Sequence, residues 1–256
     1  MIVVFANQRH EYICDLLRHQ RRIEVIEAAK LLEVTPETIR KDLDQLEREG
    51  VLRRVHGGAI LIENLRAEIN IDSRLQLSNE EKVAIATNAV SLLRDGDSII
   101  IDSGSTTHLF AQCIPEGIEL MVVTNSPHIA LSLSNRPELS VLLIGGRLRS
   151  KTASTVDAWA IDALQDIRVS IAFMGANGIS VERGATTPDP SEAAVKRGMV
   201  QAAKEVVILA DSTKFGDEKF ARFANISEIS KLITDKALPN YAVTALEGAG
   251  VEVVLS

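Results

Sequence analysis

The hydrophobic positions near the start of the chain recur at the spacing of amphipathic helices. Ile13, Leu16 and Leu17 stand at i, i+3 and i+4, which predicts a helix over Arg9–His19. A second, shorter helix is expected over Ile26–Leu32. Two consecutive helices are therefore expected before residue 33.

A tight turn and a longer helix are expected next. Within Glu33–Pro36, Thr35 is a good N-cap and Pro36 suits the first position of a helix. The helix is predicted to run to Glu49, because Gly50 is a natural stop. Its apolar stripe recurs at i, i+4 and i+7 and consists of Ile39, Leu43 and Leu46. Two helices joined by a turn of about four residues, the second one well capped, are typical of a helix-turn-helix.

The next segment predicts a β-hairpin. Val51–His56 and Ala59–Ile62 are expected to be strands, and Gly57-Gly58 between them can form a two-residue turn. A hairpin that directly follows the second helix of a helix-turn-helix is a wing. Its basic side chains would lie next to a phosphate backbone.

Several residues of this segment are candidates for DNA contacts. Thr38, Arg40 and Lys41 would lie in the major groove, and the hairpin would hold the backbone. The full candidate set is Thr35, Thr38, Arg40, Lys41, Arg53, Arg54 and His56. Plain helix packing, with Arg40 and Lys41 on a solvated face, is the alternative; the basic hairpin favours DNA binding.

From Glu80 onward, helical segments alternate with short apolar runs rich in β-branched residues. Helices are expected over Glu80–Leu93 and Thr107–Cys113, and strands over Asp97–Asp102, Leu120–Thr124, Ser140–Ile144, Ser170–Gly175, Val206–Asp211, Lys231–Thr234 and Val251–Val254. This alternation predicts an α/β fold with a mostly parallel sheet covered on both faces. Residues 63–79 have weak periodicity, so we expect a helix-turn-helix domain over 1–62, a linker over 63–79 and a larger α/β domain over 80–256.

Polar residues gather directly after several predicted strands, where open parallel sheets bind their ligands. The first cluster lies between a strand and a helix and consists of Asp102, Ser103, Gly104, Ser105, Thr106 and Thr107. Small residues let backbone N–H groups converge, hydroxyls add donors, and the helix N-terminus supplies positive potential, which together favour phosphate. Serine and glycine also serve turn geometry in such loops, which is the alternative for this cluster alone.

Other predicted strand ends carry similar clusters. They hold Thr124 and Asn125; Gly145 and Gly146; Gly175, Asn177 and Gly178; and Asp211 and Lys214. Glu192 and Lys196 could share one helix face, although a solvated pair would have the same spacing. Together these clusters predict a small polar anionic ligand, with Lys82 or Lys214 near its charge.

The charge is divided unevenly along the 256 residues, which carry a net charge of −7. Residues 1–60 hold ten basic and ten acidic residues, so the whole excess falls on the remainder and does not exclude DNA as a partner of the first segment. Cys14 and Cys113 are far apart in helical segments, which argues for a reducing cytoplasm rather than a disulfide framework. The sequence contains no run of 18 apolar residues, so no membrane span is expected.

The chain resembles the DeoR family of bacterial repressors. The resemblance rests first on residues 34–43 (VTPETIRKDL), 46–50 (LEREG) and 52–59 (LRRVHGGA), and then on 81–86 (EKVAIA), 96–107 (GDSIIIDSGSTT), 123–126 (VTNS), 145–146 (GG), 173–179 (FMGANGI), 192–197 (EAAVKR), 210–215 (ADSTKF) and 232–235 (LITD). It implies a winged helix-turn-helix, a sensor domain similar to ribose 5-phosphate isomerases, and repression of a carbohydrate-use operon modulated by a phosphorylated sugar. Thr35 and Lys41 replace the usual Ser and Arg of the family. Residues 155–160 lack the usual Gly-Pro pair, and this second departure puts effector specificity in doubt.

An isomerase with an accessory DNA-binding domain is the main alternative. Aldose–ketose isomerisation needs a carboxylate base, and the isomerases place carboxylates where this chain has Asn177 and Gly178. Glu192 and Lys196 remain, so the sequence favours a non-enzyme without closing the question. A third possibility is an architectural DNA-binding protein with a vestigial sensor.

The remaining expectations concern partners and cofactors. Paired operator half-sites imply a homo-oligomer, either a dimer or a tetramer. The five histidines show no metal-ligand spacing, so no metal or other cofactor is expected. Trp159 and the two tyrosines are expected to pack in the interior.

Overall fold

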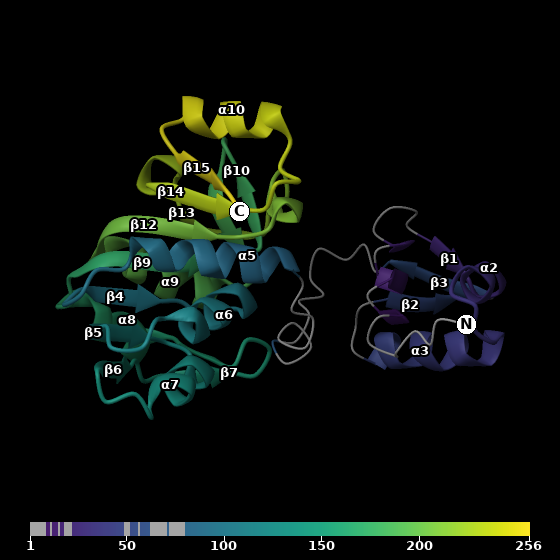
Figure 1. Ribbon diagram of the computed structural model, residues 1–256, viewed down its shortest axis with the longest axis horizontal. Helices are drawn as coiled ribbons and strands as arrows, with labels where there is room; N and C mark the ends of the chain where they lie inside the picture. The colour runs from purple at the N-terminus through teal and green to yellow at the C-terminus, as the bar shows by residue number, and fades with distance from the viewer. Residues whose placement is uncertain are drawn as a thin grey trace. The chain divides into compact units, whose positions relative to one another are not determined.

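The computed structural model describes residues 9–10, 12–14, 16–17, 22–48, 52–55, 57–61, 71 and 80–256, with the backbone alone at 53, 60 and 61. The chain divides into two compact units, Met1–Leu77 and Ser78–Ser256, which we describe separately (Figure 1). The predicted linker over 63–79 lies almost wholly outside the described residues.

The first unit contains the predicted helix-turn-helix and hairpin. Residues 9–10, 12–14 and 16–17 are helical, and they are followed by β1 (Arg22–Glu24), α2 (Val25–Leu31), α3 (Pro36–Arg48), β2 (Leu52–Val55) and β3 (Gly58–Leu61). The predicted stripe Ile39, Leu43 and Leu46 is buried in the core of this unit. Asp42 of α3 is buried and accepts two hydrogen bonds from Arg9, at 2.8 and 3.0 Å, which fixes the first helix against α3.

The hairpin differs from the expectation in two respects. The strand β1 was not predicted; it pairs with β3 and completes a three-stranded sheet. Val55 pairs with Gly58, so the turn lies one residue earlier than the predicted Gly57-Gly58. A Cβ on Gly58 would lie 2.0 Å from the carbonyl oxygen of Ile23, so Gly58 is required by the close approach of β1 rather than by the turn.

The second unit is built on a seven-stranded sheet in which every pairing is parallel. Its spatial order is β15 (Glu252–Leu255), β14 (Lys231–Thr234), β12 (Ala203–Leu209), β9 (Val169–Gly175), β4 (Ser98–Ile101), β5 (Leu120–Thr124) and β6 (Leu139–Leu143). All seven strands were predicted, with shifts of a few residues at their ends, and the α/β fold class is confirmed.

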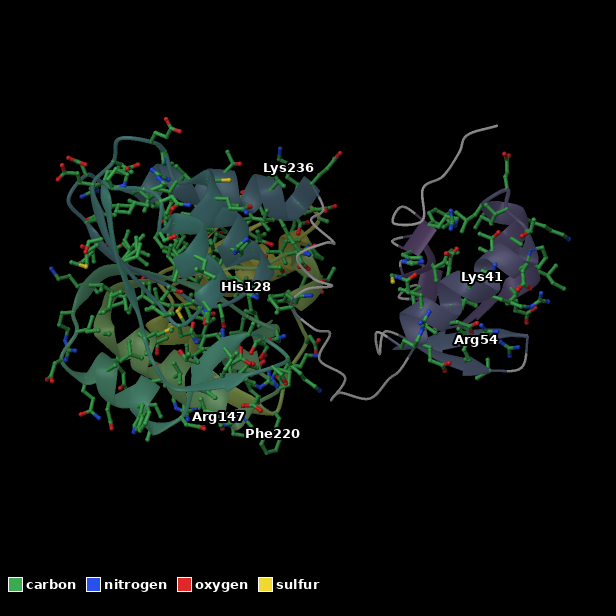
Figure 2. The ribbon with its side chains drawn as sticks, turned by 90° about the horizontal axis from the view of Figure 1, so that it is seen from below. Lys41, Arg54, His128, Arg147, Phe220 and Lys236 are labelled. Carbon is green, nitrogen blue, oxygen red and sulfur yellow. The ribbon has the colours of Figure 1, made fainter. Side chains whose placement is uncertain are left out.

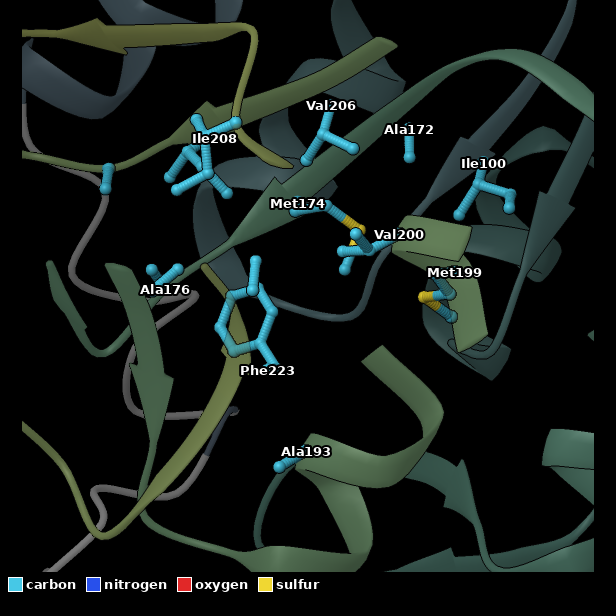
Figure 3. Close-up of a cluster of buried hydrophobic side chains, with 14 of the residues drawn as sticks. Ile100, Ala172, Met174, Ala176, Ala193, Met199, Val200, Val206, Ile208 and Phe223 are labelled. Carbon is cyan, nitrogen blue, oxygen red and sulfur yellow. The ribbon is translucent and has the colours of Figure 1, made fainter. Parts of the chain in front are cut away.

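Helices cover both faces of this sheet because its strand residues are apolar on both sides (Figure 1). Ile99 and Ile101 pack in the cluster that contains buried residues of α5 (Glu80–Ala89), α6 (Ser105–Cys113) and α7 (Pro127–Leu133). Ile100 points to the opposite cluster, which includes buried residues of α8 (Ala158–Gln165), α9 (Pro190–Ala202) and α10 (Asn240–Gly248). Figure 3 shows residues of this second cluster, among them Met174 and Ile208 of the sheet and Met199 and Val200 of α9.

Small accessory elements surround the sheet and were not predicted. They comprise the hairpin β7 (Arg147–Arg149) and β8 (Ser154–Val156), and the antiparallel sheet of β10 (Gly178–Ser180), β11 (Gly184–Thr187) and β13 (Ala221–Ala224). Three short 3-10 helices are η1 (Val90–Leu92), η2 (Ser212–Lys214) and η3 (Ile226–Glu228). These strands are three or four residues long, too short for a periodic pattern to reveal them.

The expectation that Trp159 and the two tyrosines pack in the interior is wrong. Trp159 of α8 is 79% exposed, and Tyr12 and Tyr241 are exposed as well. Trp159 is the second residue of α8. The N-cap of this helix, Asp157, has a φ of +77°. Asp157 therefore has a backbone conformation that glycine adopts most easily. It lies within residues 155–160, the segment that lacks the usual Gly-Pro pair.

We expect Gly146→Ala to destabilise the second unit. Gly146 has a φ of +144°, and a Cβ there would lie 2.6 Å from the carbonyl oxygen of Val156 in β8. The substitution should lower the free energy of unfolding in a denaturant titration by about 1–3 kcal/mol. The matched control is Gly145→Ala, because Gly145 faces open space; it should change stability by less than about 0.5 kcal/mol. Equal effects of the two substitutions would contradict this role of Gly146.

Candidate functional site

The topology of the sheet places two of the predicted clusters side by side. From β4 the chain runs outward through β5 and β6, and it later returns to β9 on the other side of β4. Open parallel sheets bind ligands at such a switch point, outside the carboxyl ends of the strands. Residues 102–107 follow β4, and residues 175–178 begin with the last residue of β9, so both clusters lie at the carboxyl ends of two neighbouring strands. We call this region the crevice, after the place where such sheets bind their ligands.

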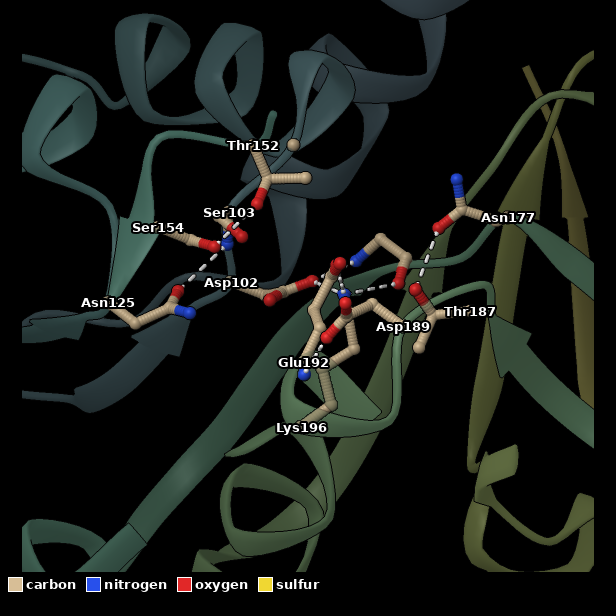
Figure 4. A network of polar contacts seen from close by, with 12 residues as sticks. Asp102, Ser103, Asn125, Thr152, Ser154, Asn177, Thr187, Asp189, Glu192 and Lys196 are labelled. Carbon is tan, nitrogen blue, oxygen red and sulfur yellow. Dashed lines mark hydrogen bonds and ion pairs between the residues drawn. The ribbon is translucent and has the colours of Figure 1, made fainter. Parts of the chain in front are cut away.

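A buried ion pair joins the two strands at this point. Lys196 of α9 is 1% exposed and donates a short hydrogen bond to Oδ2 of Asp102, which is 0% exposed (Figure 4). The N–H of Gly175 donates to the same Oδ2 at 3.0 Å, and Lys196 Nζ donates to the carbonyl oxygen of Gly175 at 3.0 Å. Asp102, Lys196 and the β9 terminus therefore hold one another in place.

The predicted Glu192–Lys196 pair exists, but it is not solvated. Glu192 is 2% exposed, and its Oε1 lies 3.7 Å from Lys196 Nζ. Lys196 Nζ also lies 5.0 Å from the centroid of the Phe223 ring, within cation–π distance. The helix α9 begins where it does because Asp189 accepts the N–H of Glu192 at 3.0 Å and Pro190 follows.

Arg149 belongs to this network and was missed in the sequence. It lies at the end of β7, where its Nε is 3.2 Å from Asp189 Oδ2 and its Nη1 is 3.7 Å from Glu192 Oε2. Burial raises the pKa of Asp189, but the backbone N–H of Glu192 and the charge of Arg149 hold it below its usual value. The Asp-Pro pair before α9 was readable as a helix start; the fold of the β7–β8 hairpin, which delivers Arg149, was not.

Three buried polar atoms in the crevice have no hydrogen-bond partner among the described residues: Asp102 Oδ1, Ser103 Oγ and Ser105 Oγ. Ser105 begins α6, and the N-cap residue Gly104 has no side chain to bond the first N–H groups of the helix. One carboxylate oxygen, two hydroxyls and an uncapped helix N-terminus at this place would suit a ligand that offers both hydroxyl donors and negative charge.

Other predicted residues make internal hydrogen bonds that shape the crevice. The N–H of Ser103 donates to Asn125 Oδ1 at 3.1 Å, and Asn125 Nδ2 donates to the carbonyl oxygen of Thr155 at 3.3 Å. Thr124 Oγ1 accepts the N–H of Ser126, and Thr107 Oγ1 donates to the carbonyl oxygen of Gly104, both at 3.1 Å. Thr106 is buried in the first turn of α6.

Residues after β9 are similarly engaged. Asn177 Oδ1 accepts a hydrogen bond from the hydroxyl of Thr187 at 3.2 Å. A Cβ on Gly178 would lie 2.2 Å from the carbonyl oxygen of Asp217. Gly146 and Gly178 are thus approached by the chain's own backbone, and the assignment of these glycines to ligand binding stays a prediction.

A second cluster lies at the end of β12. Lys214 Nζ is 3.7 Å from Asp211 Oδ2, and Asp235 accepts two hydrogen bonds from Ser212, at 2.7 and 2.9 Å. Burial raises the pKa of Asp211, but Lys214, a hydrogen bond from Thr213 and the charge of Lys82 hold it below its usual value. The charges of Lys82 and Lys214 therefore both act on the carboxylate of Asp211, and the role of these lysines in binding an anionic ligand stays a prediction.

The predicted DNA-contact residues of α3 and its N-cap differ in the partners that they have within the protein. Thr35 Oγ1 caps the helix by accepting the N–H of Thr38 at 3.2 Å, and the two hydroxyls lie 2.9 Å apart. Arg40 is exposed and pairs with Glu37 at 3.2 Å. Lys41 is exposed on the next position (Figure 2). The predicted cap is confirmed, and its hydroxyls are already engaged with each other.

Arg54 of the hairpin is directed at α3. Its Nη1 pairs with Asp44 and donates to the carbonyl oxygen of Arg40 at 3.0 Å, while its N–H donates to Glu47 at 2.7 Å. In this arrangement Arg54 fixes the hairpin to the helix, and a DNA contact by Arg54 stays a prediction. Two further predicted contacts lie outside the described residues: the side chain of Arg53, and His56.

Two features are absent from the part of the chain that the structure describes. None of its helices has the length and apolar character needed to cross a membrane. No group of three or more His, Cys, Asp and Glu residues there is arranged to hold a metal ion.

We expect Lys196→Met to destabilise the protein strongly, because it leaves the charge of Asp102 buried without its partner. The cost in a denaturant titration should be about 3–5 kcal/mol. Lys204→Met, at an exposed position of β12, is the control and should change stability by less than about 0.5 kcal/mol. Adding Asp102→Asn to Lys196→Met should recover part of the loss; an additive further loss would show that the two charges are not coupled.

The chain matches two family profiles in the order of its two units. Residues 9–64 match the DeoR-like helix-turn-helix domain, and residues 77–236 match the DeoR C terminal sensor domain. One solved structure of similar fold is ribose 5-phosphate isomerase A from Methanocaldococcus jannaschii. It is 21% identical, with a TM-score of 0.40 over 52% of this chain and 53% of that one, which is a distant likeness.

Curated relatives match over nearly the whole length. An uncharacterized HTH-type transcriptional regulator of Bacillus subtilis, YulB, is 35% identical over 96% of this chain and 95% of its own. The HTH-type transcriptional repressor GlcR of the same organism is also 35% identical, over 99% and 97%. The protein therefore belongs to the DeoR family of helix-turn-helix transcriptional regulators.

Proposed function

We propose that the protein is a transcriptional repressor of carbohydrate-use genes whose affinity for operator DNA is modulated by a phosphorylated sugar. The observation that carries the proposal is the set of unpartnered atoms in the crevice: Asp102 Oδ1, Ser103 Oγ and Ser105 Oγ. Leaving a buried polar group without a partner costs about 1–3 kcal/mol, so such groups are expected where a ligand supplies the partner. The resemblance to the DeoR family implies the same class of effector.

The phosphate and the sugar hydroxyls of the ligand would bind to different groups of the crevice. Its phosphate would accept hydrogen bonds from the hydroxyls of Ser103 and Ser105 and from the N–H groups of residues 104–107, with Lys82 and Lys214 as counter-charges. Its sugar hydroxyls would donate to Asp102 Oδ1 and lie near Asn177 and Glu192. Asn125, whose amide is satisfied by the chain, would hold Ser103 in position.

The unit over residues 1–62 would bind the operator and residues 80–256 would sense the ligand, with 63–79 as the linker. Paired half-sites favour a dimer or tetramer acting in the cytoplasm. The ligand can change DNA affinity only if it binds one arrangement of the protein better than another. The proposal therefore requires that the ligand bind one arrangement of the protein more tightly than the other.

The isomerase alternative is less favourable because the carboxylates of the crevice, Asp102 and Glu192, are both paired with Lys196. Asn177 is an amide engaged by Thr187, and the space beside Gly178 is taken by the backbone of Asp217. Of these two carboxylates, Asp102 is held through Oδ2 by Lys196, and Glu192 is paired with both Lys196 and Arg149. A general base must be able to reach and accept a substrate proton, so we propose that the protein has no enzymatic activity.

The ligand can be identified with a thermal-shift panel of phosphorylated pentoses, hexoses and hexitols. For the compound that stabilises the wild type, Ser103→Ala and Ser105→Ala should each weaken binding by about tenfold or more in calorimetric titration. Each removes a hydrogen bond to a charged group, worth about 1.5–3 kcal/mol. Neither should lower the stability of the free protein, because neither hydroxyl has a partner there.

Ser230→Ala is the control, because its hydroxyl accepts the N–H of Val206 at the opposite end of the sheet. It should weaken the fold slightly and leave ligand binding intact. Full affinity in the Ser103 and Ser105 variants would refute the proposed phosphate position. Turnover of ribose 5-phosphate that is abolished by Glu192→Gln would show that the protein is an enzyme and would contradict the proposed sensor function.

We expect Lys41→Ala to weaken binding to all DNA duplexes alike. The measurement is fluorescence anisotropy at several salt concentrations, on an operator selected by the wild type from a random library and on an unrelated duplex. Loss of one phosphate contact should reduce the slope of log K against log salt by about 1 per binding unit. Lys236→Ala, an exposed lysine of the other unit, should change nothing (Figure 2). An unchanged slope in Lys41→Ala would remove Lys41 from the interface.

A further inference from the structure

A cavity lies in the Ser78–Ser256 unit, apart from the residues of the crevice. It measures about 490 Å³, a size typical of small-molecule sites. Its walls come from α9, from β13 with the residues that follow it, and from the connection between β10 and β11; they include Arg183, Arg197, Gln201, Arg222, Phe223 and Asn225. None of the residues with unpartnered atoms in the crevice, Asp102, Ser103 and Ser105, lines it.

Three arginines from three separate elements converge on this cavity. Arg183 comes from the β10–β11 connection, Arg197 from α9 and Arg222 from β13. Within the described part of the chain, none of the three forms an ion pair with a carboxylate. Arg197 Nη1 instead donates to the carbonyl oxygen of Arg222 at 2.7 Å, which ties α9 to β13. Like charges gathered without a counter-charge repel one another, so an anion in this cavity would relieve that repulsion.

The acidic residue of the cavity wall does not neutralise the arginines. Glu228 of η3 lines the cavity, but its Oε2 accepts the N–H of Asn225 at 2.7 Å and the Nδ2 of Asn225 at 2.8 Å. This capping box directs the carboxylate to the start of η3. The described walls therefore keep a net positive charge.

The cavity and the crevice share a wall. Phe223 lines the cavity, and its ring lies 5.0 Å from Lys196 Nζ of the crevice network. Lys196 and Arg197 are neighbours on α9, one buried towards Asp102 and the other exposed towards the cavity. An anion that draws α9 and β13 together would therefore act on the residues that hold Asp102.

We propose that this cavity is a second anion-binding site of the protein, for a compact, multiply charged molecule that carries phosphoryl or carboxylate groups. Guanidinium groups present paired donors in the geometry that both groups accept, which makes arginine the favoured residue for such anions. Because the site adjoins α9 and Phe223, its ligand would be coupled to the occupant of the crevice, and the coupling must be reciprocal. This site does not depend on the proposed identity of the crevice ligand.

The test is a calorimetric titration of the full chain with pyrophosphate and, separately, with citrate. The variant is Arg183→Gln/Arg222→Gln; Arg197 is kept because its hydrogen bond joins α9 to β13. It should weaken binding of at least one probe by tenfold or more without lowering the unfolding temperature of the free protein. The matched control, Arg94→Gln/Arg168→Gln, removes two exposed arginines from other surfaces of the same unit and should leave binding unchanged.

Ser103→Ala/Ser105→Ala separates this site from the crevice, and it should retain the component of binding that Arg183→Gln/Arg222→Gln removes. The proposal would be overturned if neither probe bound the wild type, or if the arginine variant and its control lost equal affinity, which would indicate an effect of bulk charge. It would also be overturned by a loss in the serine variant alone, which would place the probe in the crevice. A changed oligomer mass of the arginine variant with unchanged anion binding would likewise overturn it, because it would assign the arginines to a contact between chains. Failure of the proposed sugar-phosphate effector would leave the expected results unaltered.

Discussion

The buried pair between Asp102 and Lys196 is the interaction on which the sensor unit depends. It lies where the strand order reverses, and it joins β4, β9 and α9 through one carboxylate oxygen, one ammonium group and the peptide of Gly175. Taking two charges out of water is costly, and well-packed apolar residues would often be equally stable there. The pair is therefore better explained by what it positions, because it fixes the second carboxylate oxygen of Asp102 in the crevice without a partner.

This division of one carboxylate explains why the crevice suits recognition. Asp102 Oδ2 is held by the protein, while Asp102 Oδ1 and the hydroxyls of Ser103 and Ser105 have no partner among the described residues. The groups are already ordered by Asn125 and by the first turn of α6, so a ligand would not have to order them on binding. The neighbouring carboxylates Glu192 and Asp211 are paired with Lys196, Arg149 or Lys214.

The sequence was most informative where a single physical cause sets a local pattern. The strands of the parallel sheet are buried on both faces and appear as apolar runs, and the cap at Thr35 with Pro36 marked the start of α3. Arg149 could not be predicted to join Glu192, because a short hairpin with no periodicity brings them together across 43 positions of the chain. Gly58 was misassigned to a turn because the strand that crowds it, β1, is only three residues long. Trp159 was assigned to the interior by residue type, although its helix presents it to solvent.

The helix α9 is the element through which binding at one place can affect another. Its buried face carries Glu192 and Lys196, and its exposed side carries Arg197, which is bonded to the carbonyl oxygen of Arg222 in β13. A small displacement of α9 would disturb Asp102 and the terminus of β9 together, because packed interiors tolerate few intermediate arrangements. The binding energy of an isomerase substrate must be used in the transition state. In a regulator, the energy of binding can instead shift an equilibrium between two arrangements of the protein, and that shift is what control of DNA binding requires.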